Sequence, residues 1–122
     1  MRYIPAFLLP AILILGGCYK DKRELLYPDN NCDTTNVTYS ATIQPIISQY
    51  CAYSGCHAGA APAGGIDMST HAGLQPTALS GRLKGSINHE TGFSAMPKGG
   101  AKLTDCTIRK IEIWIAGGAL NN

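Results

Sequence analysis

The chain has 122 residues, of which 45% are hydrophobic and 15% are charged, and its formal net charge is +2. A nearly neutral chain lacks the strongly basic surface that nucleic-acid binding uses, so we expect no nucleic-acid partner. The length fits a single domain. The sequence contains no catalytic triad, nucleotide-binding loop or paired-carboxylate motif, so a conventional hydrolase is unsupported, and we expect no enzyme.

Residues 1–17 have the pattern of a lipoprotein signal peptide. Arg2 supplies a positive charge, and the apolar stretch Ile4–Leu15 is shorter than the roughly 20 residues that a membrane-spanning helix needs. Leu15-Gly-Gly-Cys18 then matches a bacterial lipobox, in which small residues precede a cysteine that takes a diacylglycerol. We therefore predict lipidation of Cys18. The alternative is an ordinary signal peptide with an incidental cysteine.

Residues 18–36 are charged at first and then rich in turn-forming residues, which predicts a lipidated N-terminus and tether. The remaining residues, 37–122, form the predicted domain. Two or three acyl chains bind a membrane far more firmly than one. We therefore expect a protein that is lipid-anchored at the cell envelope, either facing the periplasm or on the outer membrane.

The domain is predicted to begin with a helix over residues 40–50. Ser40 or Thr42 can cap this helix, and Pro45 falls near its first turn, where the missing N–H costs least. Its apolar residues recur at the spacing of one buried helical face: Ile43, Ile46, Ile47 and Tyr50.

The most specific motif follows directly, as Cys51-Ala-Tyr-Ser-Gly-Cys56-His57. Two cysteines with a histidine after the second form the pattern of covalent haem attachment, in which the thiols become thioethers and the imidazole binds the iron. The usual motif has two residues between the cysteines, whereas four stand here. Ser54-Gly55 tolerates the tight turn that the longer spacing requires. The motif predicts one covalent haem c.

The middle of the domain is predicted to hold short elements. Residues 58–65 contain no side chain larger than proline, which fits a surface loop or a backbone packed closely against a haem. A short helix is expected to begin near Ser69. A further turn or helix is expected over residues 79–87, with Leu83 and Ile87 directed inward.

Met96 is the candidate for the second iron ligand. It stands 39 residues after His57, before Pro97, in a glycine-rich loop. A thioether is a soft ligand that suits haem iron, and ligation by one histidine and one methionine raises the reduction potential. A lone methionine is more often core filler, but the Met-Pro context favours ligation here.

Three other residues compete for that role. Met68 is interpreted as a core residue. His71 and His89 stand in polar sequence surroundings, which predict that both are exposed to solvent.

The last helix is predicted to run to about Ala116, with Thr104 or Asp105 as its cap. Trp114 is expected to pack in the core or against the haem edge. Gly117-Gly118 is typical of a helix end. Three isoleucines are predicted to share one face: Ile108, Ile111 and Ile115.

These motifs together resemble a class I c-type cytochrome domain and, more narrowly, the small cytochrome c-like lipoproteins of Bacteroidetes-type bacteria. The resemblance covers about residues 37–119 and rests on the aliphatic first helix, Cys51 to His57, Met96-Pro97 and the segment 111–119. It implies an all-α fold, a small cytochrome c-like bundle around one covalent haem, with the first and last helices crossing. It also implies one-electron transfer to redox partner proteins of the cell envelope.

Cys32 and Cys106 remain after the lipid and haem assignments. Exported proteins fold in an oxidising compartment, so this even remainder predicts a disulfide between them. Three alternatives stay open. In the first, Cys51 and Cys56 form a disulfide in a haem-free structural lipoprotein. In the second, the two cysteines bind zinc together with His57. In the third, the haem belongs to a sensor or an enzyme with an open iron position.

Overall fold

The computed structural model describes residues 31–122. The predicted signal peptide, the lipidation of Cys18 and most of the tether lie outside the described residues. Within them the fold is all-α, as predicted, and no helix is long and apolar enough to cross a membrane. The elements are the π-helix η1 (Tyr39–Ile43), α2 (Gln44–Tyr50), the 3-10 helix η2 (Ala63–Gly65), α3 (His71–Leu79), α4 (Arg82–Asn88) and α5 (Asp105–Ala116).

The predicted first helix is present as η1 followed directly by α2, but its cap differs from the prediction. Thr38, in an extended conformation, caps the segment, and its Oγ1 accepts a hydrogen bond from the N–H of Ala41 at 3.2 Å. Ser40 and Thr42 already lie inside the helical turn. The cap prediction was wrong because helical geometry begins one residue earlier than the apolar periodicity indicates.

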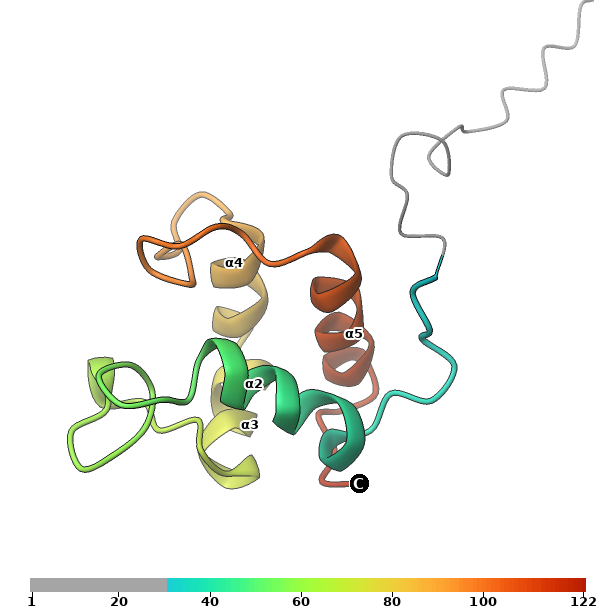
Figure 1. The fold of residues 1–122 in the computed structure, drawn as a ribbon, viewed down its shortest axis with the longest axis horizontal. Helices are drawn as coiled ribbons and strands as arrows, with labels where there is room; N and C mark the ends of the chain where they lie inside the picture. The colour runs from blue at the N-terminus through green and yellow to red at the C-terminus, as the bar shows by residue number, and fades with distance from the viewer. Residues whose placement is uncertain (1–30) are drawn as a thin grey trace, which may run out of the picture.

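The two short middle helices lie close to their predicted positions. Thr70 caps α3 by accepting a hydrogen bond from the N–H of Gly73 at 3.2 Å, so the helix begins two residues after Ser69. Leu83 and Ile87 of α4 are buried, as predicted. Figure 1 shows α4 above α3, with α5 beside them on the right.

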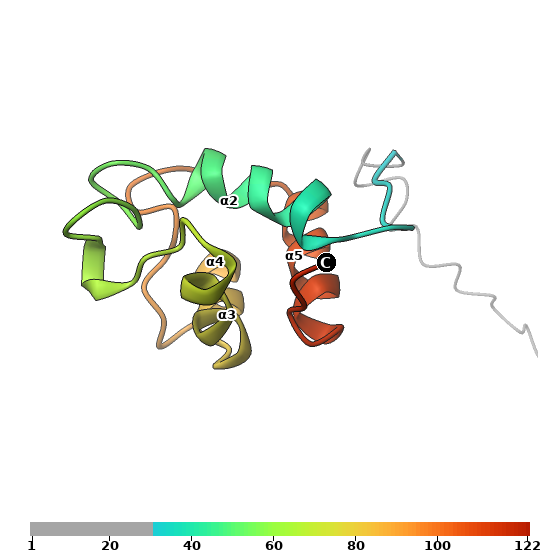
Figure 2. The same ribbon diagram turned by 90° about the horizontal axis from the view of Figure 1, so that it is seen from below.

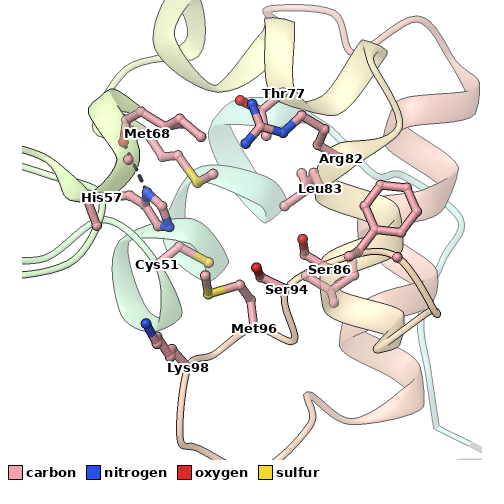
Figure 3. A pocket seen from close by; sticks show the side chains of 16 residues that line it. Cys51, His57, Met68, Thr77, Arg82, Leu83, Ser86, Ser94, Met96 and Lys98 are labelled. Atoms are coloured by element: carbon pink, nitrogen blue, oxygen red, sulfur yellow. Dashed lines mark hydrogen bonds between the residues drawn. The ribbon is translucent and has the colours of Figure 1, made fainter.

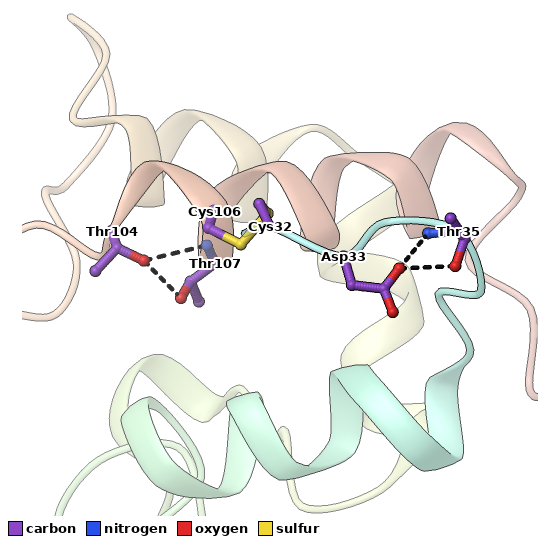
Figure 4. Close-up of a disulfide and its surroundings, with 6 residues drawn as sticks. All are labelled: Cys32, Asp33, Thr35, Thr104, Cys106 and Thr107. Carbon is purple, nitrogen blue, oxygen red and sulfur yellow. Dashed lines mark hydrogen bonds between the residues drawn. A yellow bond between two sulfur atoms is a disulfide. The ribbon is translucent and has the colours of Figure 1, made fainter. Parts of the chain in front are cut away.

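The last helix and the disulfide agree with prediction. Thr104 caps α5 by accepting a hydrogen bond from the N–H of Thr107 at 3.2 Å, and the helix ends at Ala116. Cys32 and Cys106 are joined by a disulfide (Figure 4), which ties the segment before the domain to the first turn of α5.

The helices enclose one hydrophobic core. In both ribbon views α2 runs across the other helices (Figures 1 and 2). Packed element pairs include α3 with α4, α4 with α5, and α5 with η1. The core holds buried residues from every α-helix, the largest fully buried ones being Ile43, Ile47, Leu74, Ile87 and Ile111.

An aromatic cluster of Tyr39, His71 and Trp114 closes one end of this core. The ring centroids of Tyr39 and His71 lie 4.8 Å apart in an edge-on arrangement, and Tyr39 and Trp114 lie 5.9 Å apart. His71 Nε2 donates a hydrogen bond to the carbonyl of Ala119 at 2.8 Å. The prediction that His71 is exposed to solvent was therefore wrong, because a carbonyl 48 residues away satisfies the ring.

Candidate functional site

A cavity of about 410 Å³ lies at the other end of the core. This volume is within the range of about 300–1,000 Å³ typical of small-molecule sites. Cys51, His57 and Met96 all line it, although they come from the end of α2, the following turn and the loop after α4. Figure 3 shows these three side chains directed into the same region. The structure thus assembles three of the four predicted haem-site residues around one space.

The His57 ring is held with one nitrogen free. Its Nδ1 lies 3.1 Å from the carbonyl oxygen of Ile66 (Figure 3). A carbonyl only accepts, so Nδ1 carries the proton and Nε2 of the neutral ring keeps its lone pair. The N–H of Met68 donates to the His57 carbonyl at 2.8 Å, so the segment 66–68 binds both the ring and the backbone of this histidine.

The segment 66–68 is itself fixed against the start of α3. A side chain on Gly73 would collide with the carbonyl of Asp67, so only glycine permits this close approach. The Asp67 carboxylate accepts hydrogen bonds from the N–H and the hydroxyl of Ser69. The side-chain and backbone hydrogen bonds from Ser69 lower the pKa of Asp67, which keeps this turn-forming group ionised.

The two cysteines of the motif occupy different surroundings. Cys51 ends α2, lines the cavity, and has its pKa raised to about 11, chiefly by burial and then by the nearby Cys56. Cys56 is half-buried but does not line the cavity. A hydrogen bond with Cys56 raises the pKa of the exposed Tyr53. Both thiols are free, so the disulfide that one alternative assumes is not formed here.

The turn between the cysteines uses glycine as the sequence predicts. Gly55 adopts a left-handed conformation with φ of 85°. The N–H of His57 donates to the carbonyl of Cys51 at 3.0 Å, which closes the turn and sets the histidine beside the first cysteine. The longer spacing is therefore absorbed without moving His57 away from Cys51.

Met96 is half-buried and is held by its backbone. Its N–H donates to the carbonyl of Ser86 at 3.0 Å, and its carbonyl accepts from His89 Nε2 at 3.1 Å. His89 is exposed, as predicted, yet its ring is engaged with the loop that carries Met96. Met68 is buried in the core, as predicted, and also lines the cavity.

The cavity wall includes charged and aromatic residues that the sequence analysis did not single out. Arg82 and Lys98 both line it, and among the described lining residues none is acidic (Figure 3). Phe93 lies flat against α4, where a side chain on Gly85 would overlap its ring. Arg82, Lys98 and Phe93 belong to no recognisable sequence motif. Only the fold therefore reveals that they line the same cavity as the predicted ligands.

The zinc alternative lacks its ligand set in the described part of the chain. Among residues 31–122 no three His, Cys, Asp or Glu side chains gather as a metal site would require. Comparison of the chain with models of protein families, with curated proteins and with solved structures finds no match.

Proposed function

We propose that the protein is a c-type cytochrome that transfers single electrons through one covalently bound haem c. Cys51 and Cys56 form the thioethers, and His57 and Met96 bind the iron from opposite sides. The fold is then a small cytochrome c-like bundle. The observation that carries this proposal is that His57 and Met96, 39 residues apart in sequence, line one cavity beside Cys51.

The side chains present fit a haem in three ways. His57 offers the Nε2 lone pair because Ile66 takes the Nδ1 proton, which is the hydrogen-bonding pattern of a metal-binding histidine. Met96 offers a soft sulfur. Arg82 and Lys98 supply positive charge at the cavity wall, and such charge favours the two propionates of a haem.

Cys56 is the residue that must move for this proposal. Its thiol has to turn toward the cavity that Cys51 already lines. Gly55 and Gly59, with φ of 85° and 91°, flank the segment and adopt these conformations at little steric cost. Cys56 is half-buried and its thiol is not engaged in a disulfide.

When bound, the haem supplies an iron that cycles between the ferric and ferrous states. His57 and Met96 would both hold the iron, and ligation by two protein side chains favours electron transfer over oxygen or peroxide chemistry. With Cys18 lipidated, the domain would remain at the cell envelope and meet redox partner proteins there. Its charge balance provides no strong global field to steer that encounter.

The first test asks whether haem stays attached to the denatured chain. The segment from Cys18 onward would be expressed behind a cleavable signal in a host with c-type maturation, and then analysed by denaturing gel with peroxidase staining and by intact mass. Haem that remains with the polypeptide supports thioethers at the wide spacing. A haem-free chain, lighter by two protons per cysteine pair, would favour the disulfide alternative and overturn the proposal, unless a host with another maturation system loads it.

Ligand variants then test the iron coordination. His57→Ala should lose the low-spin haem spectrum. Met96→Ala should retain the haem, lower the reduction potential and let cyanide bind readily. Met68→Leu is the matched control, because it exchanges another methionine of the same cavity at nearly constant volume. If Met96→Ala leaves the potential and the spectrum unchanged, the ligand assignment is wrong.

A further inference from the structure

The loop between α4 and Met96 is closed by a pair of contacts from one helix end. The carbonyl of Ser86 accepts from the N–H of Met96 at 3.0 Å, and His89 Nε2 lies 3.1 Å from the Met96 carbonyl oxygen. Both polar groups of the Met96 backbone are therefore bound by the last residues of α4. The side chain of Met96 is left free to face the cavity.

The conformation of His89 makes the second contact possible. His89 ends α4 in a left-handed conformation, with φ of 57° and ψ of 39°, and its own N–H donates to the carbonyl of Ser86 at 3.2 Å. Few residues other than glycine adopt this conformation, and histidine is among those enriched in it. The left-handed turn directs the chain away from the helix while the ring reaches across the loop to residue 96.

We propose that His89 is a positioning residue for Met96, holding its loop so that the sulfur stays at the iron. This inference rests on the proposed function. A carbonyl only accepts, so the ring donates through Nε2 and is not itself an iron ligand through that atom. His89 is exposed and does not line the cavity, and its ring contacts the backbone of Met96 and not the sulfur.

The effect expected from this contact is a shift in the fraction of molecules with Met96 detached. An intramolecular hydrogen bond of this kind favours the closed loop roughly fivefold over the open one. Removing it should raise the affinity of ferric iron for cyanide or imidazole by roughly the same factor, because an added ligand competes only with the open state.

The test compares four haem-loaded proteins. His89→Ala removes the donor. His89→Gln places an amide N–H near the position of Nε2, whereas His89→Asn tolerates the left-handed backbone but is too short to reach residue 96. His71→Gln is the matched control, since His71 makes the same kind of ring-to-carbonyl contact at the aromatic cluster, away from the cavity.

The readouts are imidazole affinity, the absorption band of methionine-bound ferric haem, the reduction potential and hydrogen exchange of the segment 90–98. His89→Ala and His89→Asn should bind imidazole roughly fivefold more tightly, weaken the band and exchange faster in this segment. His89→Gln should restore much of the wild-type behaviour, and His71→Gln should leave imidazole affinity unchanged.

Three results would overturn the inference, and they are distinguishable. Imidazole affinity and segment exchange in His89→Ala equal to those of the haem-loaded wild type would refute the positioning role alone. A wild-type protein that carries no haem would refute the proposed function, and this inference with it. An equal gain in imidazole affinity in His71→Gln would show general loosening of the fold and would also refute the specific role of His89.

Discussion

The two ends of the core are built differently. At the aromatic cluster, Tyr39, His71 and Trp114 pack ring against ring, and the carbonyl of Ala119 accepts hydrogen bonds from both His71 and Gln75. At the cavity, the predicted ligands stand on turns and loops that are held mainly by backbone hydrogen bonds. Packed rings fill the end with the aromatic cluster, whereas the other end contains a cavity between the predicted iron ligands.

This difference separates stability from ligand binding. The C-terminal segment completes the closed end, since Trp114 Nε1 donates to the carbonyl of Leu120 at 2.8 Å and the N–H of Tyr39 donates to Asn122 Oδ1 at 2.8 Å. The site at the open end depends on the hydrogen bonds of segment 66–68 and of the loop before Met96. Changes at the closed end should therefore alter unfolding, and changes at the open end should alter the site.

The largest effect is expected from the disulfide. Replacing Cys32 and Cys106 together with serine should lower the free energy of unfolding by about 4 kcal/mol, because the open chain regains the entropy of a long loop. Neither cysteine lines the cavity, so the haem spectrum and imidazole affinity should not change. Urea unfolding of both proteins measures the difference.

Reductant provides the control for this double variant. Added to the haem-free wild type, it should reproduce the loss of stability, and added to the haem-free variant it should leave the free energy of unfolding unchanged. A loss below 1 kcal/mol, or a changed haem spectrum, would contradict a disulfide that acts on stability alone.

Gly73→Ala is expected to cause a smaller loss of stability, together with a change at the candidate site. In an exposed helix, alanine is more favourable than glycine by about 1 kcal/mol. At this position, however, its methyl group would collide with the carbonyl of Asp67. The net result should be a loss of about 1–3 kcal/mol. The displaced segment 66–68 should also release the His57 ring, which tighter imidazole binding to the haem-loaded protein would report.

Gly100→Ala is the comparison for that substitution. Its methyl group would lie 3.4 Å from Pro97 Cβ, an ordinary contact, and Gly100 does not have a positive φ. We expect little change in stability or ligand affinity. If Gly73→Ala proves as stable as the wild type, the close approach of segment 66–68 to α3 is not required.

The smallest effect on stability at neutral pH concerns Cys51 in protein prepared without haem. Burial raises the pKa of its thiol from 9.0 to about 11, so at pH 8 it should react with iodoacetamide about a hundredfold more slowly than an ordinary cysteine. Because the folded state binds this proton more tightly, the associated stability is fully present below pH 9 and is lost as pH rises to about 11.

Comparison with the haem-loaded protein isolates the contribution of Cys51 to the pH dependence of stability. A thioether does not titrate, so the haem-loaded protein should lack the component of the stability loss that Cys51 causes between pH 9 and about 11. Subtracting the pH profile of the haem-free Cys51→Ser variant from that of the haem-free wild type isolates this component. Alkylation of Cys51 at the ordinary rate would show that its thiol is accessible and not buried.

The parts of the fold that follow from local sequence were predictable. Repeats of isoleucine located the first and last helices, and Thr104 was one of the two residues predicted to cap the last helix. The cysteine count predicted the bond from Cys32 to Cys106, since only two cysteines remained. Each of these inferences depends on the spacing of residues or on the number of cysteines, and none requires knowledge of the packed structure.

The contacts that escaped prediction join distant segments. His71 appeared polar and exposed because the carbonyl that binds it belongs to Ala119. His89 and Met96 are only seven residues apart, but no pattern in the sequence reveals that the ring reaches that carbonyl. Arg82 and Lys98 likewise line one cavity only because α4 and the following loop fold around it.

The bond between Cys32 and Cys106 also determines where a membrane anchor would pull. With a lipid on Cys18, the 14 residues leading to Cys32 reach at most about 50 Å. A force on this leash enters the domain at the first turn of α5, through a covalent bond, and bypasses η1 and α2. Helix α2, which precedes Cys51 and His57, would then carry less of this force. The length of the segment between Cys18 and Cys32 would limit the distance between the membrane and the domain when it binds a partner.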